Sequence, residues 1–204
     1  MTVYLHEHDL PADVFAAGAI AVDTETMGLH PARDRLCLVQ LADGHGDEHL
    51  VRFDRADYAA PVLKAVLADR TRTKFYHFAR FDLAVLKAYL EVDAGPVFCT
   101  KIASKLVRTY TDRHGLKDML RETIGVDVSK AQQASDWGAP VLTDAQKDYA
   151  ASDVRFLHRA VAVLTERLAR EGRTELAQAC FDFLPWRAAL DLAGWPENDI
   201  FAHL

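Results

Sequence analysis

The stretch AIAVDTET at residues 19–26 is an apolar run that ends in two carboxylates one residue apart. Its composition predicts a buried β-strand, and side chains alternate across a strand, so Asp23 and Glu25 point to one face and Thr24 to the other. Two adjacent carboxylates at the end of a buried strand are costly to ionise together unless a cation is shared between them. The stretch therefore suggests a divalent metal site, although a strand that enters a solvated loop explains the same residues equally well.

Two further acids occur where they can meet this pair. Asp82 lies in the first turns of a predicted helix. Asp153 lies in another, and Tyr149 precedes it by four residues, so a phenol and a carboxylate share one helix face. Taken singly, Asp82 also fits a solvent-facing charge near a helix N-terminus, and Tyr149 fits a core aromatic. If Asp82 and Asp153 lie beside Asp23 and Glu25 in the folded protein, a metal site is favoured over these structural roles.

The three segments Asp23-x-Glu25, His77-x4-Asp82 and Tyr149-x3-Asp153 resemble, in content and order, the motifs of the DEDD superfamily of 3′–5′ exonucleases, in its tyrosine-bearing branch. The runs at 99–106, 135–137 and 149–154 are similar to ribonuclease D. The chain as a whole looks most like the nanoRNase C group, whose short members degrade diribonucleotides. The resemblance implies a ribonuclease H-like fold and a 3′–5′ exoribonuclease that releases 5′-monophosphates.

The resemblance also implies a two-metal site. The acidic quartet Asp23, Glu25, Asp82 and Asp153 is expected to hold two Mg²⁺ or Mn²⁺ ions, the arrangement used for in-line phosphoryl displacement. Carboxylate oxygens favour these ions over zinc. Tyr149 is expected to orient the attacking water or to take its proton, and its ordinary pKa near 10 makes it a weak base without help from the metals. These five residues form the predicted catalytic set.

Substrate contacts are expected from six residues near the motifs. By resemblance, Leu29 is an apolar wedge between two bases; otherwise it is an ordinary core leucine. His77 can contact the sugar or phosphate or be structural, and Phe81 can stack on a base or pack in the core. The full set is Thr24, Gly28, Leu29, His77, Phe81 and Trp137, with Gly28 turning the backbone beside the metals and Trp137 covering the pocket. Candidates for a 5′ phosphate contact are Lys101, Lys105, Arg108, Arg113 and Lys130, although most such side chains are merely solvated.

The patterning predicts one α/β domain over residues 1–204 with a mixed central sheet flanked by helices. Three closely spaced strands suggest an antiparallel meander. Strands are expected at 3–6, 19–26, 35–41, 48–53, 73–78 and 97–99. Helices are expected at 56–67, 79–90 and 100–109, the last capped by Thr100, and from Thr143 to about Arg170. Residues 172–204 form a helical, aromatic extension that must pack on this domain or on a neighbouring subunit.

Composition limits the partners and the compartment. A net charge of −6 argues against a protein that follows long nucleic acid by electrostatics, but not against a short oligonucleotide. The chain shows neither a membrane-spanning apolar run nor a secretory signal, and its three cysteines suit reduced buried thiols, so a cytoplasmic location is expected. The resemblance further implies a homo-oligomer, for which a closed ring is one form.

Three functions remain open from the sequence. The favoured one is a metal-dependent exoribonuclease acting on very short RNA, because ribonuclease D carries helical RNA-binding domains that 204 residues do not accommodate. The nearest alternative is a general ribonuclease D-like exonuclease that trims RNA or DNA 3′ ends. The remote alternative is a catalytically silent module that binds nucleic acid, which the complete acidic quartet disfavours.

Overall fold

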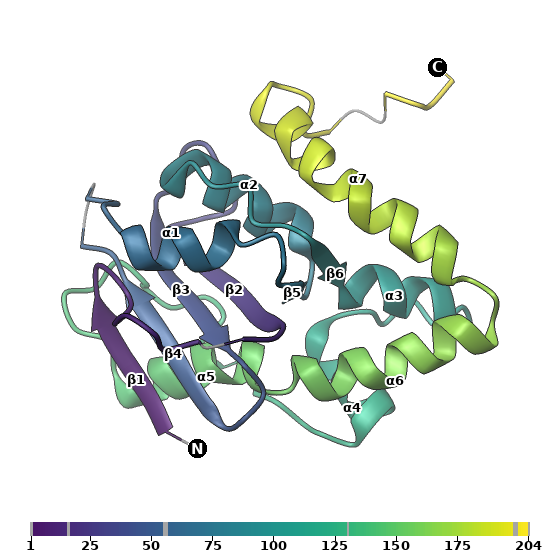
Figure 1. The fold of residues 1–204 in the computed structure, drawn as a ribbon, viewed down its shortest axis with the longest axis horizontal. Coiled ribbons are helices and arrows are strands. Elements are labelled where there is room, and N and C mark those ends of the chain that lie inside the picture. Colours follow the sequence, from purple (N-terminus) through teal and green to yellow (C-terminus); the bar gives the residue numbers. More distant parts are fainter. Residues whose placement is uncertain (1, 16, 55–56, 130, 198–199, 204) are drawn as a thin grey trace.

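The fold is taken from a computed structural model that describes residues 2–15, 17–54, 57–129, 131–197 and 200–203. Within these residues a six-stranded sheet has the order β1-β4-β3-β2-β5-β6 (Figure 1). Its strands are β1 (Thr2–Glu7), β2 (Ile20–Thr26), β3 (Leu36–Ala42), β4 (Asp47–Arg52), β5 (Lys74–Tyr76) and β6 (Val97–Cys99). The helices are α1 (Pro61–Ala68), α2 (Ala79–Leu90), α3 (Thr100–Val107), α4 (Leu116–Ile124), α5 (Asp144–Arg155), α6 (Leu157–Arg170) and α7 (Thr174–Leu192).

The centre of the sheet is the predicted meander. Strand β3 runs antiparallel to both β2 and β4, whereas β1, β5 and β6 each pair with a neighbour in parallel. All seven residues of β3 are buried, as expected of a strand covered by helices on both faces. The mixed sheet flanked by helices is confirmed.

The two faces of the sheet have different covers (Figure 1). Helices α1 and α2 pack on one face, where Ile20 and Val22 of β2 join the larger apolar cluster. Helix α5 covers the other, where Ala21 packs with Val154. Because side chains alternate, Asp23 and Glu25 share the face of Ala21, and Thr24 shares the face of Val22. This division decides from which layer each site residue arrives.

Helix α1 starts later than the sequence pattern predicted. The expected start at residue 56 lies outside the described residues, and the helix begins at Pro61. Both carboxylate oxygens of Asp9 accept hydrogen bonds from its first turn, from the backbone N–H of Val62 at 3.0 Å and of Leu63 at 2.8 Å. A proline at the first position and a capping carboxylate from a distant turn therefore set this boundary.

The predicted helix from residue 143 to about 170 is two helices. Thr143 begins α5 with a capping box that includes Gln146, which confirms the predicted start. The helix then breaks at Phe156, because its two halves pack against different partners. Helix α5 lies on β3 and β4, and α6 lies on α3 and α4.

Helix α7 runs along α2 and β6 (Figure 1). The Arg80 guanidinium of α2 donates two hydrogen bonds, of 2.6 and 2.7 Å, to the carboxylate of Asp191 near the end of α7. Several large apolar side chains of this C-terminal part remain exposed: Leu176, Phe183, Trp186, Trp195, Ile200 and Phe201. None of the described helices is long and apolar enough to cross a membrane.

Candidate active site

Three acids from two distant segments meet at the end of β2. Asp23 and Glu25 lie on the α5 face of the sheet, and α5 places Asp153 opposite them. One carboxylate oxygen from each residue lies within 4.8 Å of the other two. The convergence expected of these three residues is therefore present in the fold.

Asp82 reaches the same region from the other layer. It is 3% exposed, and its Oδ1 accepts a hydrogen bond of 2.7 Å from the Thr24 hydroxyl. Its negative charge acts on Glu25, and the charge of Asp23 acts on Asp82, so the fourth acid lies beside the first pair. It does not belong to the group of three whose oxygens lie within 4.8 Å. Thr24, expected at the substrate, holds this carboxylate.

Burial makes all four acids hold their protons strongly. Desolvation, opposed by a hydrogen bond from the Thr24 backbone, raises the pKa of Asp23 to about 7. Desolvation and the charge of Asp23 raise the pKa of Asp153 to about 8, and the same two causes with further acids raise that of Glu25 to about 10. Desolvation also raises the pKa of Asp82 well above its usual range. Four acids in this state need positive charge before they can all ionise.

This donor set fits divalent metal ions. It offers carboxylate oxygens, the ligands that Mg²⁺ and Mn²⁺ prefer. It contains no histidine or cysteine among the described residues that form the cluster. Asp23, Glu25, Asp153 and Asp82 are the residues that would hold such ions.

Tyr149 lies one helical turn before Asp153 on α5, and the interaction of its phenol with that carboxylate opposes the rise in the pKa of Asp153. Desolvation and the surrounding acids raise the pKa of the phenol above its ordinary value. The phenol therefore stays protonated at neutral pH and acts here as a donor. Its ring packs against the indole of Trp137, with 6.0 Å between ring centroids.

The sequence suggested that Trp137 covers the pocket, but the side chain is buried in the core instead. Its side chain is 3% exposed and belongs to a small core with Cys37, Leu38 and Leu50. The large ring and the apolar neighbours on β3 and β4 account for this burial, and they place the indole beneath Tyr149.

Asp23, Glu25 and Asp153 open into a pocket of about 280 Å³. Its lining comes from β2, the start of α2, α3, α4, the segment before α5, and α5 itself: Asp23, Glu25, His77, Phe78, Lys101, Gly115, Leu116, Lys117, Val128, Ser129, Gln133, Tyr149 and Asp153. Of the expected substrate contacts, His77 and the phosphate candidate Lys101 lie in this lining. Lys101 and Lys117 are the cations that the described residues contribute to it.

The tautomer of His77 follows from its neighbour. The Thr100 hydroxyl donates to the backbone oxygen of Tyr76 at 3.0 Å and lies 2.9 Å from Nδ1 of His77. A hydroxyl has one proton, so Nδ1 of His77 must be the donor in the second contact. Thr100 is thus the first helical residue with an inward hydroxyl, and its predicted capping role is wrong.

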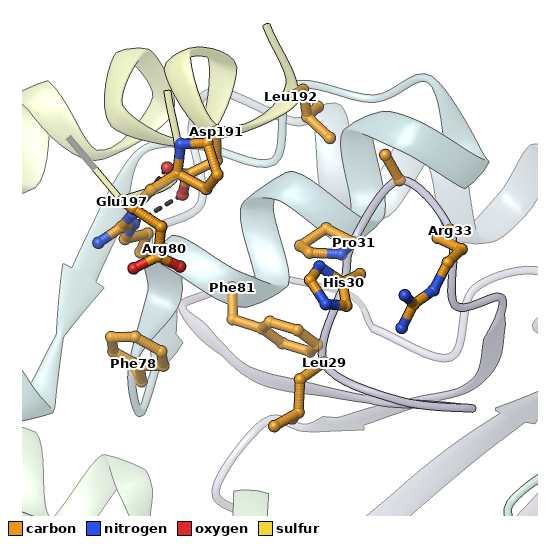
Figure 2. A pocket seen from close by; sticks show the side chains of 12 residues that line it. Leu29, His30, Pro31, Arg33, Phe78, Arg80, Phe81, Asp191, Leu192 and Glu197 are labelled. Carbon is orange, nitrogen blue, oxygen red and sulfur yellow. Dashed lines mark hydrogen bonds and ion pairs between the residues drawn. The ribbon is translucent and has the colours of Figure 1, made fainter. Parts of the chain in front are cut away.

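A second pocket, of about 600 Å³, adjoins the first at Phe78 (Figure 2). Leu29 and Phe81 line it, and the Arg80 to Asp191 ion pair closes the side next to α7. Leu29 is 85% exposed, so it is not an ordinary core leucine. An exposed leucine at a pocket edge is available for contact with a ligand.

Some expected contacts lie elsewhere. A Cβ on Gly28 would meet Asp34 Oδ2 at 2.3 Å, so glycine is needed there for close approach of that carboxylate. Arg108 is fully buried and ion-paired with Glu122, so it is not placed to hold a phosphate. Lys130 lies outside the described residues.

Sequence reasoning missed Phe78. This residue has a left-handed backbone, with φ of 77°, and its side chain is 43% exposed where the two pockets meet. Non-glycine residues in this conformation are uncommon and cluster at functional sites. The ammonium group of Lys101 lies 4.1 Å from the centre of its ring. No local sequence pattern predicts a left-handed backbone at a phenylalanine, so the conformation of Phe78 is visible only in the structure.

Comparisons with known proteins agree with this geometry. A family model described as 3′–5′ exonuclease matches residues 6–170. Ribonuclease D of Gluconacetobacter diazotrophicus is 33% identical over 158 residues, which are 76% of this chain and 39% of that protein. The chain thus spans about two fifths of the length of this ribonuclease D relative.

Solved structures match over the full length. The apo form of a nuclease is 57% identical, with a TM-score of 0.98 and complete coverage of both chains. Brucella melitensis NrnC bound to pGG is 55% identical, with a TM-score of 0.97 and the same coverage, and this nuclease has also been solved with bound Mg²⁺. The chain therefore belongs to the 3′–5′ exonuclease family, in the group that contains Brucella melitensis NrnC.

Proposed function

We propose that this protein is a metal-dependent 3′–5′ exoribonuclease that hydrolyses very short RNA, with dinucleotides as the favoured substrate and 5′-monophosphates as products. The observation that carries the proposal is the meeting of Asp23, Glu25 and Asp153 within 4.8 Å, beside Asp82 and in a pocket that contains Tyr149. The solved NrnC structures with pGG and with Mg²⁺, about 55% identical over the full chain, support the same substrate and metal.

The residues have distinct roles in this proposal. The four acids bind two Mg²⁺ or Mn²⁺ ions. When bound, such ions supply the positive charge that activates water and stabilises the leaving oxygen in phosphodiester hydrolysis. Tyr149, whose phenol stays protonated, orients the attacking water beside Asp153. His77, Leu29 and Phe81 contact the substrate from the two adjoining pockets.

The shape and charge of the site favour a short substrate. Pockets of about 280 and 600 Å³ meet at Phe78, and volumes of this order hold small ligands rather than a tracked polymer. The net charge of −6 supplies no general attraction for long nucleic acid. Both features suit a substrate of a few nucleotides that depends on bound cations.

Time courses with Mg²⁺ on 5′-phosphorylated RNAs of two to about seven nucleotides test this function. We expect the dinucleotide to be degraded fastest. Equal rates at all lengths would reject the dinucleotide preference and leave a general exonuclease.

A ribonuclease D-like trimming activity is the second candidate, favoured by the 33% identity to Gluconacetobacter diazotrophicus ribonuclease D. Rapid shortening of a long RNA hairpin with a single-stranded 3′ tail would support it. A protein that binds Mn²⁺ in calorimetry but cleaves neither substrate would instead be a silent binding module.

We further propose that the protein forms a homo-oligomer through residues 172–204, and that it acts in the cytoplasm. Trp186 and Phe201 are 69% and 75% exposed, and apolar side chains gathered in this way mark an interaction surface. The three cysteines are free, which suits a reducing compartment. Light scattering after size exclusion should show an oligomer that Trp186→Glu and Phe201→Glu disrupt. Val141→Glu, at an equally exposed site away from α7, should leave it intact; an unchanged mass in all variants contradicts the assigned interface.

A further inference from the structure

Gln40 is the polar residue of an otherwise apolar strand. The other residues of β3 are Leu36, Cys37, Leu38, Val39, Leu41 and Ala42, and all are buried. Gln40 is fully buried as well. Burying an amide among apolar side chains costs free energy, so its presence requires a compensating interaction.

That interaction is with Asp23. The two residues stand directly opposite each other in the antiparallel pair of β2 and β3, at the centre of the sheet (Figure 1). Residues directly opposite in such a pair project from the same face. The Nε2 group of Gln40 donates a hydrogen bond of 3.3 Å to Oδ2 of Asp23.

Packing and hydrogen bonding within the core do not account for this side chain. Its other polar atom, Oε1, is buried and has no hydrogen-bond partner among the described residues. A side chain selected for stability alone would avoid an unpaired buried oxygen, because such an atom costs more than an apolar replacement. The hydrogen bond to the Asp23 carboxylate is therefore the interaction that accounts for an amide at position 40.

A neutral donor suits a carboxylate that must also bind a cation. A lysine or arginine at position 40 would pair with Asp23 as a fixed cation and oppose the binding of a second one. An amide restrains one oxygen of Asp23 and leaves the charge of the cluster unchanged. Thr24 is likewise a neutral donor, to Asp82, so neither of these two pairs places a fixed cation beside the carboxylate.

We propose that Gln40 is a positioning residue that orients Asp23 for metal binding through the contact between Nε2 and Oδ2. The inference rests on the proposed metal-dependent function. Partners that hydrogen-bond a ligating carboxylate typically contribute 10- to 100-fold to metal affinity or activity. Gln40 itself contacts neither metal nor substrate in this proposal.

The test is Mn²⁺ calorimetry without substrate, together with melting temperature and the Mg²⁺ concentration that gives half-maximal rate on a 5′-phosphorylated diribonucleotide. Gln40→Met keeps the side-chain volume and removes the donor. Gln40→Asn keeps an amide but shortens the side chain by one methylene, which withdraws the donor from Asp23. Gln178→Met is the matched control, because Gln178 makes an amide to carboxylate hydrogen bond with Asp182 on the exposed surface of α7.

We expect both Gln40 variants to bind Mn²⁺ roughly 10- to 100-fold more weakly and to need more Mg²⁺ for half-maximal rate, with the melting temperature of Gln40→Met at or above that of the wild type. Gln178→Met should match the wild type. Wild-type metal affinity in both Gln40 variants overturns the inference, as does a loss of melting temperature with unchanged affinity. If Gln40→Met fails to fold, Gln40→Asn decides. A wild-type protein that binds no Mn²⁺ refutes the proposed function instead, so the two failures are distinguishable.

Discussion

The hydroxyl of Thr24 donates a hydrogen bond of 2.7 Å to Oδ1 of Asp82, and this contact joins the central strand to helix α2 inside the protein. Strand alternation turns Thr24 away from Asp23 and Glu25, toward the layer from which Asp82 comes. The acid in the first turn of α2 is thereby held at the end of β2. Thr24, between Asp23 and Glu25 in the sequence, thus holds the carboxylate of Asp82 in position.

Replacing Thr24 with valine keeps the shape and removes the donor. We expect the free energy of unfolding to fall by about 1–3 kcal/mol, because the buried Asp82 loses its partner. Metal affinity should fall as well. Chemical denaturation and Mn²⁺ calorimetry measure the two effects. Thr174→Val, at the exposed start of α7, is the control; equal effects from both variants would contradict the assigned contact.

Removing the phenol hydroxyl should separate catalysis from metal binding. In Tyr149→Phe the ring still packs on Trp137, so we expect little change in melting temperature. Turnover of a 5′-phosphorylated diribonucleotide should fall roughly 100-fold or more, because the donor that orients water is lost. Asp23→Ala, by contrast, should abolish both turnover and Mn²⁺ binding. A Tyr149→Phe enzyme with the wild-type rate excludes a role for the phenol in the reaction.

The metal-free protein should lose stability as pH rises. Glu25, Asp153 and Asp23 have folded-state pKa values of about 10, 8 and 7, all above those of exposed carboxyl groups, so the native state keeps protons that the unfolded chain releases. The stabilisation is therefore complete near pH 4 and is lost as pH rises through about 7 to 10. Urea denaturation in EDTA between pH 5 and 9 measures this decline.

Two controls accompany that measurement. Glu25→Gln should flatten the decline, because the group that titrates highest is gone, whereas Glu175→Gln on the surface of α7 should leave it unchanged. Added Mg²⁺ should restore stability most at high pH, since binding requires the ionised carboxylates. Stability that is flat or rising over this range in the metal-free wild type would show that the acids are already ionised.

Leu29 should affect substrate affinity without affecting the fold. Its side chain is 85% exposed at the edge of the pocket in Figure 2, so Leu29→Ala removes almost no buried apolar area. We expect the Michaelis constant for a diribonucleotide to rise roughly tenfold or more if the side chain contacts a base. Val141→Ala, at a 79% exposed site away from α7, is the comparison. Identical Michaelis constants for the two variants would remove Leu29 from the substrate site.

The local parts of this architecture were predictable from the sequence. The alternation in residues 19–26 predicted a buried strand with Asp23 and Glu25 on one face, and helical spacing placed Tyr149 beside Asp153. The bounds of α2 and β6 follow their sequence patterns. The boundary of α1 did not, because the carboxylate that caps it belongs to Asp9, more than 50 residues earlier. Helical periodicity also continued through Phe156, where packing against different layers divides one predicted helix into two.

By itself, the sequence determined the order and approximate positions of the strands and which faces the acids occupy, because period and spacing are properties of neighbours along the chain. Only the tertiary structure decided that Asp82 arrives from the opposite layer and meets Thr24, that Trp137 lies under Tyr149, and that Gln40 faces Asp23. Each of these depends on which elements pack together. Contacts across layers join residues far apart in sequence, and no local pattern of polarity encodes their partners.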